Sequence, residues 1–543
     1  MLFRGTAIVS ALTLLSRLLG FVRDLLVARL LGASMFADAF FVAFRIPNLL
    51  RSFVAEGALT SAFTPVFSTS VTQGNDRARD TCRRVSGFLL VVTSILTVVL
   101  ISYAPSIVRL FAPGFSAEGG KFELCVTLTR MMAPYIACVS FIAMLNAALN
   151  TLGIFGASAW AQVIMNLVLI VGAICAMPCD LTTATIILAA SVLVGGIAQI
   201  IAQAPACARA RLSLRPSFAI LVPEIAELVR LMIPATIGAS IYQITIFMAT
   251  ALASLLSSGS VSWLFYADRI AQFPIGIFSI ALASVLLPAL SNASAQKDEA
   301  TFYRSLSDSL RFTSFFIIPM AAGLWSLSLP IIQVLFERGA FNHDSSIRTS
   351  HALRALALGL WATSCHSMII RAFIAKKDTR TPTIIGACSL MIYLCASLLL
   401  IGPLAPHIHP SRLVSLIRNL QTSLIYISPI SADLGHVGLA LASSIAAFGS
   451  LVLVVIMFSV KIQHFPWRAF LSAITKTLIA SCVMTLGVRY CVQLTHVPLL
   501  QCIYGASIGV SLFLAVSYIL RSQELLDTIA TILRRRTAHS VQS

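Results

Sequence analysis

Charged residues are scarce in this chain, which has 543 residues of which only 11% are charged and 58% are hydrophobic. A typical soluble domain carries about 25% charged residues. So few charges would leave a soluble body of this size with a large uncovered apolar surface, and such surfaces aggregate. The same composition excludes a disordered chain, and no collagen or coiled-coil repeat is present. The mean hydropathy of +0.92 therefore indicates an integral membrane protein.

Acidic residues are scarcer still, with 20 Asp and Glu against 38 Lys and Arg, a formal net charge of +18. No Asp or Glu occurs in residues 231–257, 381–402 or 436–460, so we expect no carboxylate cation site there. No Walker A sequence is present, and the twelve Cys are scattered, without metal-ligand or disulfide spacing. We therefore expect no cofactor, no metal and no enzymatic activity, and we expect that nucleic acid is not the partner of the positive charge.

The hydrophobic stretches predict an all-α polytopic membrane protein with fourteen transmembrane helices, each about 20 residues long. The first two stretches hold charges in mid-span, and residues 6–31 have an alternative interpretation as an amphipathic helix on the bilayer surface. The predicted spans are residues 6–31, 36–66, 86–106, 129–150, 157–177, 182–204, 231–256, 262–289, 311–335, 352–374, 381–402, 436–460, 467–493 and 500–520.

The distribution of Lys and Arg between the loops predicts the orientation. With the N-terminus inside, 22 of the 38 positive residues fall in inner segments and nine in outer segments or helix edges. Cytoplasmic loops carry the excess of Lys and Arg in membrane proteins. Both termini are therefore predicted to face the cytoplasm, and the residues 521–543 form a basic cytoplasmic tail.

Two parts of the chain resemble each other at a nearly constant spacing. Residues 58–61 match 281–284 at an offset of 223, residues 43–46 match 267–270 at 224, and residues 28–31 match 253–256 at 225. The repeat unit is six helices, which predicts two lobes in a pseudo-two-fold arrangement, a plan common in transporters. We assign residues 1–222 to the N-terminal lobe, 223–462 to the C-terminal lobe, and 463–520 to two extra C-terminal helices.

Five arginines within or at the edges of these spans carry the functional hypothesis, namely Arg17, Arg23, Arg45, Arg51 and Arg269. Facing lipid, they would together cost on the order of 12–18 kcal/mol. We therefore expect them to face a hydrated cavity or a partner. Because the guanidinium fork matches phosphate oxygens in pairs, a cationic cavity would favour a phosphorylated, anionic substrate.

The alternative is that each arginine is neutralised by a carboxylate and only holds helices together. Asp24 lies seven residues after Arg17, and Asp38 lies seven before Arg45, so each pair shares a helix face. The other two acids fit less well: Asp268 directly precedes Arg269, and Glu56 follows Arg51 by five residues.

These charged residues stand in motifs that resemble the MurJ (MviN) family of the MOP exporter superfamily. The amino-terminal block is the most specific, and the likeness runs over essentially the whole chain. The matching stretches are SRLLGFVRD at 16–24, ADAFFVAFRIPNLLR at 37–51, AEGA at 55–58, YADR at 266–269, FPIG at 273–276 and LP at 287–288.

The resemblance implies a flippase that moves lipid II, the undecaprenyl-pyrophosphate-linked disaccharide-pentapeptide, across the bacterial inner membrane by alternating access. It implies that Arg17, Arg23, Arg51 and Arg269 bind the substrate. Ser16, Asp24, Asp38, Arg45, Glu56 and Asp268 are the expected supporting cavity residues. Spans 13 and 14 would form a groove for the lipid tail, and the cell-wall synthesis machinery is a candidate partner. Residues 405–434 are an insertion relative to the family's usual short outer loop.

Two other functions stay open at this point. One is a related exporter of another polyprenyl-linked oligosaccharide, since an arginine cavity would also suit that substrate. The other is a membrane scaffold for cell-wall enzymes that transports nothing.

Overall fold

The computed structural model describes residues 2–54, 58–213, 215–219, 222–404, 412–427, 432–461 and 465–530. They divide into two compact units. The first comprises residues 1–262, 338–342 and 404–418, and the second comprises 263–337, 343–403 and 419–543. Glu56 lies outside the described residues, as do most of the positive charges of the tail.

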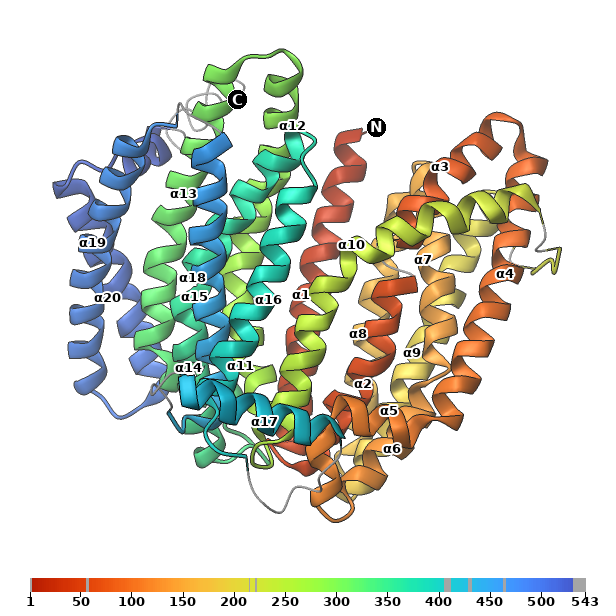
Figure 1. Ribbon diagram of the computed structural model, residues 1–543, viewed down its shortest axis with the longest axis horizontal. Helices are drawn as coiled ribbons and strands as arrows, with labels where there is room; N and C mark the ends of the chain where they lie inside the picture. Colours follow the sequence, from red (N-terminus) through yellow and green to blue (C-terminus); the bar gives the residue numbers. More distant parts are fainter. Residues whose placement is uncertain are drawn as a thin grey trace, which may run out of the picture. The chain divides into compact units, whose positions relative to one another are not determined.

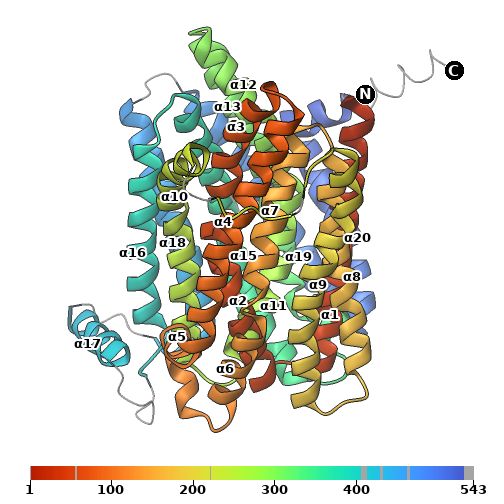
Figure 2. The ribbon, with the colours of Figure 1, turned by 90° about the vertical axis from the view of Figure 1, so that its right-hand side faces the viewer.

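Helices make up the first unit (Figures 1 and 2). In this unit α1 packs on α8, and α8 packs on α9 (Figure 2). The helices are α1 (Leu2–Leu31), α2 (Met35–Val54), α3 (Ala58–Thr72), α4 (Asn75–Ser102), α5 (Ala104–Phe111), α6 (Lys121–Met132), α7 (Tyr135–Thr151), α8 (Phe155–Ala176), α9 (Leu181–Arg209) and α10 (Pro223–Ser254), with a short 3₁₀ turn at Pro113–Ala117.

The second unit is also helical, and its last two helices, α19 and α20, pack on each other (the blue pair in Figure 1). Its elements are α11 (Ser260–Pro274), which begins in the first unit, a π-helical segment (Ile275–Ser279), α12 (Ile280–Ala295), α13 (Glu299–Ser326), α14 (Ser328–Phe336), α15 (His343–Ala375), α16 (Arg380–Leu400), α17 (Arg412–Ile427), which also begins in the first unit, α18 (Gly435–Lys461), α19 (Trp467–Gln493) and α20 (Pro498–Ile519).

The two units share an internal packing order. In the first, α3 packs on α4 and α7, α4 on α7, α7 on α9, and α9 on α8. In the second, α12 packs on α13 and α15, α13 on α15, α15 on α18, and α18 on α16. The repeat offset relates α3 to α12, α4 to α13 and α8 to α16, and α18 lies further along the chain than the offset predicts because the segment 405–434 precedes it. The same order of contacts is what two copies of one helical unit would produce.

Helix α10 does not follow this order. It is the repeat counterpart of α1, yet it packs on α3, α2 and α5 and belongs to the first unit. The observed units therefore divide at residue 262, whereas the repeat places the lobe boundary at 222. The division into two units follows the contacts that each helix makes in this structure, and not the repeat in the sequence. The lobe boundaries inferred from the repeat therefore stay a prediction.

Membrane-spanning character is clear in the described part of the chain. Nine helices are long and apolar enough to cross a bilayer, or eleven if the bent pairs α6–α7 and α13–α14 each count as one span. Large apolar side chains such as Val98, Ile201 and Val510 are exposed on these helices, as expected where lipid covers the surface. The count of fourteen stays a prediction, and the spans that hold most of the mid-span arginines, α1 and α2–α3, are among those outside the eleven.

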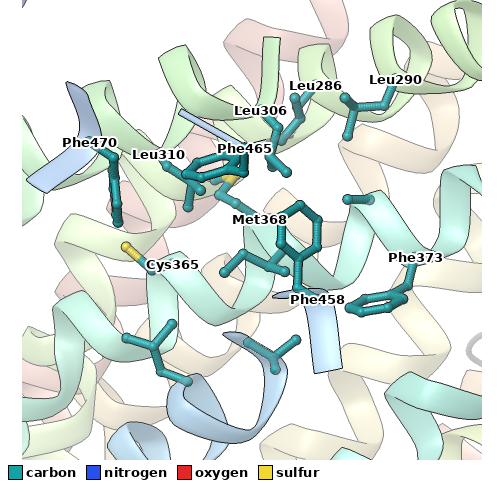
Figure 3. Close-up of a cluster of buried hydrophobic side chains, with 14 of the residues drawn as sticks. Leu286, Leu290, Leu306, Leu310, Cys365, Met368, Phe373, Phe458, Phe465 and Phe470 are labelled. Carbon is teal, nitrogen blue, oxygen red and sulfur yellow. The ribbon is translucent and has the colours of Figure 1, made fainter. Parts of the chain in front are cut away.

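The largest core cluster of the second unit is formed by α12, α13, α15 and α18 together with the start of α19 (Figure 3). Met368 and Cys365 of α15 are enclosed by the aromatic rings of Phe458, Phe465 and Phe470. Phe465 meets both Phe458 and Phe470 edge-on, at centroid distances of 5.7 and 6.0 Å, a favourable geometry for aromatic pairs. This packing fixes α15 against its neighbours.

The insertion at 405–434 contains helix α17. Its Gln421 is buried and donates to the carbonyl oxygens of Leu398 and Gly402, at 3.1 and 2.6 Å. These carbonyls lie at the end of α16, where a helix leaves its last carbonyls without intrahelical donors. The side chain of Gln421 thus caps the preceding span and ties α17 to it.

The chain beyond α20 is anchored by Glu524, which is 2% exposed and accepts a hydrogen bond of 2.7 Å from Arg311 of α13 and one of 2.7 Å from Ser522. Burial alone would raise the pKa of Glu524. The hydrogen bonds from Ser522, its own backbone and Arg311 outweigh that effect and hold the pKa below its ordinary value.

We predict that acid releases this anchor. A carboxyl group with a lowered pKa stabilises the folded state above its unfolded pKa, about 4.3, and the stabilisation is lost as the pH falls through the folded pKa. The protection factors of the amides of residues 523–530, which correct for the slower intrinsic exchange at low pH, should therefore be high at pH 7 and fall below about pH 4. Glu524→Gln should exchange faster at pH 7 and lack the acid step, and an unchanged acid step in that variant would contradict the assignment.

Candidate functional site

Arg23 of α1 is held in a polar cluster with α8. Its Nε and Nη2 donate to Oδ1 of Asp24, at 3.0 and 2.8 Å, and its Nη1 donates to Oδ1 of Asn166, at 3.0 Å. Asn166 in turn donates to the carbonyl oxygen and the hydroxyl of Ser16, at 2.9 and 3.2 Å. The cluster brings together three predicted site residues and neutralises Arg23 with an adjacent carboxylate.

The other arginines of the first unit lie in different surroundings. Arg17 is exposed on α1. Arg45 of α2 is half-buried, and its Nη1 donates to the hydroxyl of Thr250 on α10, at 2.5 Å. Arg51 lies near the end of α2, where the structure describes the backbone only.

Asp38 is enclosed, not exposed to a cavity. The carboxylate is 1% exposed and accepts from Nζ of Lys121 at 3.0 Å, and Lys121 is equally buried. It also accepts from the backbone N–H groups of Gly259 and Ser262, at 2.7 and 2.9 Å, and from the Ser262 hydroxyl at 2.6 Å. Asp38 therefore caps the start of α11 in the manner of an N-cap carboxylate.

Asp38 was a candidate partner for Arg45 because the two share a helix face, but its carboxylate pairs with Lys121. Seven residues along a helix separate two side chains by about 10 Å, so sharing a face does not bring them into contact. Lys121, the first residue of α6, lies beside Asp38 and also pairs with Glu118 at 3.0 Å. The Phe115 ring lies 4.3 Å from the Lys121 ammonium and adds a cation–π contact.

Arg269 belongs to the second unit, on α11. It is half-buried, with its Cζ 4.9 Å from the centre of the Phe265 ring, one turn earlier. Asp268 is exposed and accepts a hydrogen bond from Nε2 of Gln272. Asp268 and Arg269 therefore lie in different surroundings, as expected for adjacent residues on a helix. The π-helical segment that follows Pro274 widens the helix one turn after Arg269, and such segments often occur at functional sites.

Three partners of the predicted site residues escaped the sequence analysis: Asn166, Thr250 and Lys121. Each comes from a different part of the chain and is separated from its partner by 83 to 205 residues. Asn166 is one of the few polar residues in a largely apolar span, and that contrast was the one signal available from the sequence. Thr250 and Lys121 carry no comparable signal.

Comparison with known proteins decides the family. The model of the family described as "Lipid II flippase MurJ" matches residues 27–407. The chain belongs to this family. The MurJ match spans α2, α3, α11 and α12, so it contains both copies of the repeat and Arg269.

Curated MurJ relatives cover most of the chain. The "Probable lipid II flippase MurJ" of Vibrio cholerae is 34% identical over 460 residues, which are 83% of this chain and 82% of that protein. The "Lipid II flippase MurJ" of Burkholderia cenocepacia is 36% identical over 396 residues, 72% of this chain and 77% of that protein.

Solved structures agree with this assignment. A "Lipid II flippase MurJ, inward closed conformation" matches with a TM-score of 0.75 and 26% identity, covering 94% of this chain and 98% of that chain. An inward-facing multidrug resistance MATE transporter of the MOP superfamily matches with a TM-score of 0.63 at 14% identity, covering 82% and 94%, which shows a shared fold. The resemblance of the motifs to MurJ is thus confirmed.

We predict that Lys121→Met lowers stability sharply. It would leave the Asp38 carboxylate buried without its cation, and breaking a buried pair costs about 3–5 kcal/mol. Thermal unfolding in detergent should show the loss, and the double variant Lys121→Met with Asp38→Asn should lose less than the two single losses combined.

Asp344→Asn is the matched control, because Asp344 is 64% exposed and pairs with Arg348 at 2.7 Å. Removing an exposed pair should cost about 1 kcal/mol or less. Equal losses for Lys121→Met and Asp344→Asn would contradict a structural role for the buried pair.

Proposed function

We propose that this protein flips lipid II from the cytoplasmic to the outer leaflet of the bacterial inner membrane. The observation that carries the proposal is the family match over residues 27–407, which contains Arg51 and Arg269. The relatives in Vibrio cholerae and Burkholderia cenocepacia bear that function in their names.

In this proposal Arg17, Arg23, Arg51 and Arg269 bind the pyrophosphate of the substrate. Guanidinium groups suit this role because they donate paired hydrogen bonds to phosphate oxygens. Arg17 is exposed and Arg269 is half-buried, which supports access to a ligand. Arg23 is held by Asp24 and Asn166, and these contacts fix the geometry in which it would meet the substrate.

The proposed topology has fourteen spans with both termini in the cytoplasm. The eleven apolar spans, with α1, α2–α3 and α10, would make up that number. Under this topology the site arginines lie on helices that cross the hydrocarbon, where a cation facing lipid is unfavourable by roughly 2.5–3.5 kcal/mol. A hydrated path for an anionic head group avoids this cost.

The proposed mechanism is alternating access. The head group of lipid II enters an arginine-lined cavity from the cytoplasmic side while the lipid tail remains in hydrocarbon, and it leaves on the outer side. Moving one charge through 100 mV is worth roughly 2.3 kcal/mol, so an inside-negative potential favours the outward movement of an anion and the inward return of the empty cationic site.

The family assignment argues against a scaffold that transports nothing, since the named relatives are flippases. An exporter of another polyprenyl-linked oligosaccharide is the second candidate. Depletion of the protein in its native cell distinguishes the two by the lipid-linked precursor that accumulates in the inner leaflet: lipid II for a lipid II flippase, and another lipid-linked sugar for the second candidate.

We predict that charge alone does not sustain transport. Arg17→Lys, Arg51→Lys and Arg269→Lys keep the positive charge but lose the forked contacts, each worth about 1.5–3 kcal/mol. Flipping of lipid II in proteoliposomes should fall roughly tenfold to a hundredfold in each variant.

Arg130→Lys is the matched control, because Arg130 is exposed and its Nε donates to the carbonyl oxygen of Ile101 at 3.2 Å. It should flip lipid II at the rate of the unchanged protein. Full activity in all three site variants would count against phosphate recognition by their guanidinium groups.

We also predict that the membrane potential drives the cycle. Collapsing the potential in proteoliposomes while the ion gradients are kept intact should abolish net accumulation of lipid II in the outer leaflet. Continued accumulation under that condition would exclude the potential as the driving force and require an ion gradient instead.

A further inference from the structure

The span formed by α13 and α14 is sharply broken. The two helices meet at Leu327 and are bent by 73° to each other. Leu327 is buried and packs against Val488 of α19 in the cluster that joins α13, α19 and α20. The bend is therefore a fixed part of the second unit, with α19 beside it.

Two arginines from different helices contact this bend. Nε of Arg354 on α15 donates to the hydroxyl of Ser328, at 2.7 Å, and Ser328 is fully buried. Cζ of Arg489 on α19 lies 5.4 Å from the centre of the Trp325 ring. Trp325 and Ser328 are three residues apart across the bend, so both guanidinium groups gather at the same short turn.

Neither guanidinium has an acidic partner in the part of the chain that the structure describes, whereas two other basic residues of α15 do. Arg348 pairs with Asp344, and His343 with Glu337. The sequence explains the difference, because residues 309–336, 345–377 and 467–519 contain no Asp or Glu. The two positive charges are close enough to repel each other, and His351 on the same face of α15 adds a third basic group.

The bend lies toward the outer ends of its helices under the predicted topology. Arg489 is four residues from the end of α19 at Gln493, and Trp325 is one residue from the end of α13. Trp is enriched where the hydrocarbon meets the head groups, and Arg reaches phosphates from there. The two guanidinium groups thus stand at the level where lipids of the outer leaflet carry their phosphates.

We propose that Arg354 and Arg489, with Trp325 and the Ser328 hydroxyl, form a binding site for the phosphate group of a lipid in the outer leaflet. This site is separate from the residues assigned to substrate binding above, and it rests on the proposed topology but not on the proposed transport of lipid II. An anionic phosphate relieves the repulsion between the two guanidinium groups and fills donors that no carboxylate of α13, α14, α15 or α19 can reach.

Phosphate suits the site better than a carboxylate would. Arg354 uses Nε on Ser328, which leaves its terminal nitrogens for a ligand, and Arg489 is exposed while its guanidinium plane rests near the indole. Two guanidinium groups from two helices can each bind separate oxygens of one tetrahedral phosphate, whereas a planar carboxylate has only two oxygens. The ligand could be the head group of a phospholipid or an isoprenyl pyrophosphate, which share this chemistry.

The test uses the full chain in detergent and the fluorescence of Trp325 as a local reporter. The probes are dioctanoyl phosphatidylglycerol, geranyl pyrophosphate and inorganic pyrophosphate, each titrated separately. We expect a saturable fluorescence change with at least one lipid probe, absent in Trp325→Phe, and a dissociation constant raised at least tenfold in Arg354→Gln with Arg489→Gln. The probe that saturates at the lower concentration identifies which lipid the site prefers.

Arg348→Gln is the matched control, since Arg348 lies on the same helix but is paired with Asp344. It should bind as the unchanged protein does, and the melting temperature of every variant must stay within a few degrees of it. If the double glutamine variant does not keep its fold, Arg354→Lys with Arg489→Lys replaces it, and weakened binding is expected there too, because the forks are lost.

Three results would overturn the proposal: no saturable change with either lipid, equal weakening by Arg348→Gln, or saturation by inorganic pyrophosphate alone. The last would assign the site to free phosphate and not to a lipid. The chain has five Trp, so the readout is the part of the fluorescence change that is absent in Trp325→Phe, and binding to Arg17 or Arg269 does not confound it.

Discussion

The cost of a charge in hydrocarbon governs where this protein can place its few charged groups. Water solvates an ion far better than a bilayer does, so a cation in a span must find an acid, a polar partner or a hydrated space. Arg23 finds Asp24 and Asn166, Arg45 finds Thr250, and Lys121 finds Asp38. The contacts between helices in the first unit depend on these pairings as much as on apolar packing.

This constraint also separates structural from functional charges. Lys121 and Asp38 are both buried and form an ion pair, and Asp38 also accepts hydrogen bonds from the start of α11. The role of this pair is therefore structural. Arg354 and Arg489 contact the α13–α14 bend, and neither pairs with an acid among the residues that the structure describes. A protein with 20 acidic residues against 38 basic ones cannot neutralise every cation internally, and those left over are the ones available to anionic ligands.

Prolines lie close to the arginines in both copies of the repeat. In the second copy of the repeat, the span from α11 to α12 contains a π-helical segment directly after Pro274. The first copy has Pro47 inside α2, between Arg45 and Arg51. A proline removes one backbone donor and loosens the helix around it, so each copy carries a proline close to its arginines.

Much of the architecture follows from composition and spacing. The low charge content and the long apolar runs were enough to predict an all-helical membrane protein. The offsets of 223 to 225 residues indicated a repeat, and the two units share an order of helix packing. The motifs around Arg17, Arg51 and Arg269 were enough to identify the family, because their order of residues is rare. Each of these features is local or periodic, and local features can be read along one chain.

Tertiary structure decided the partners. Sequence spacing paired Asp38 with Arg45, yet Lys121 lies beside Asp38, and Asn166 joins Arg23 from 143 residues away. It also decided that α10 packs in the first unit and that two arginines 135 residues apart meet at one bend. Electrostatic attraction acts through space and not along the chain, so which charges neutralise each other, and which remain for a ligand, is determined only when the helices pack.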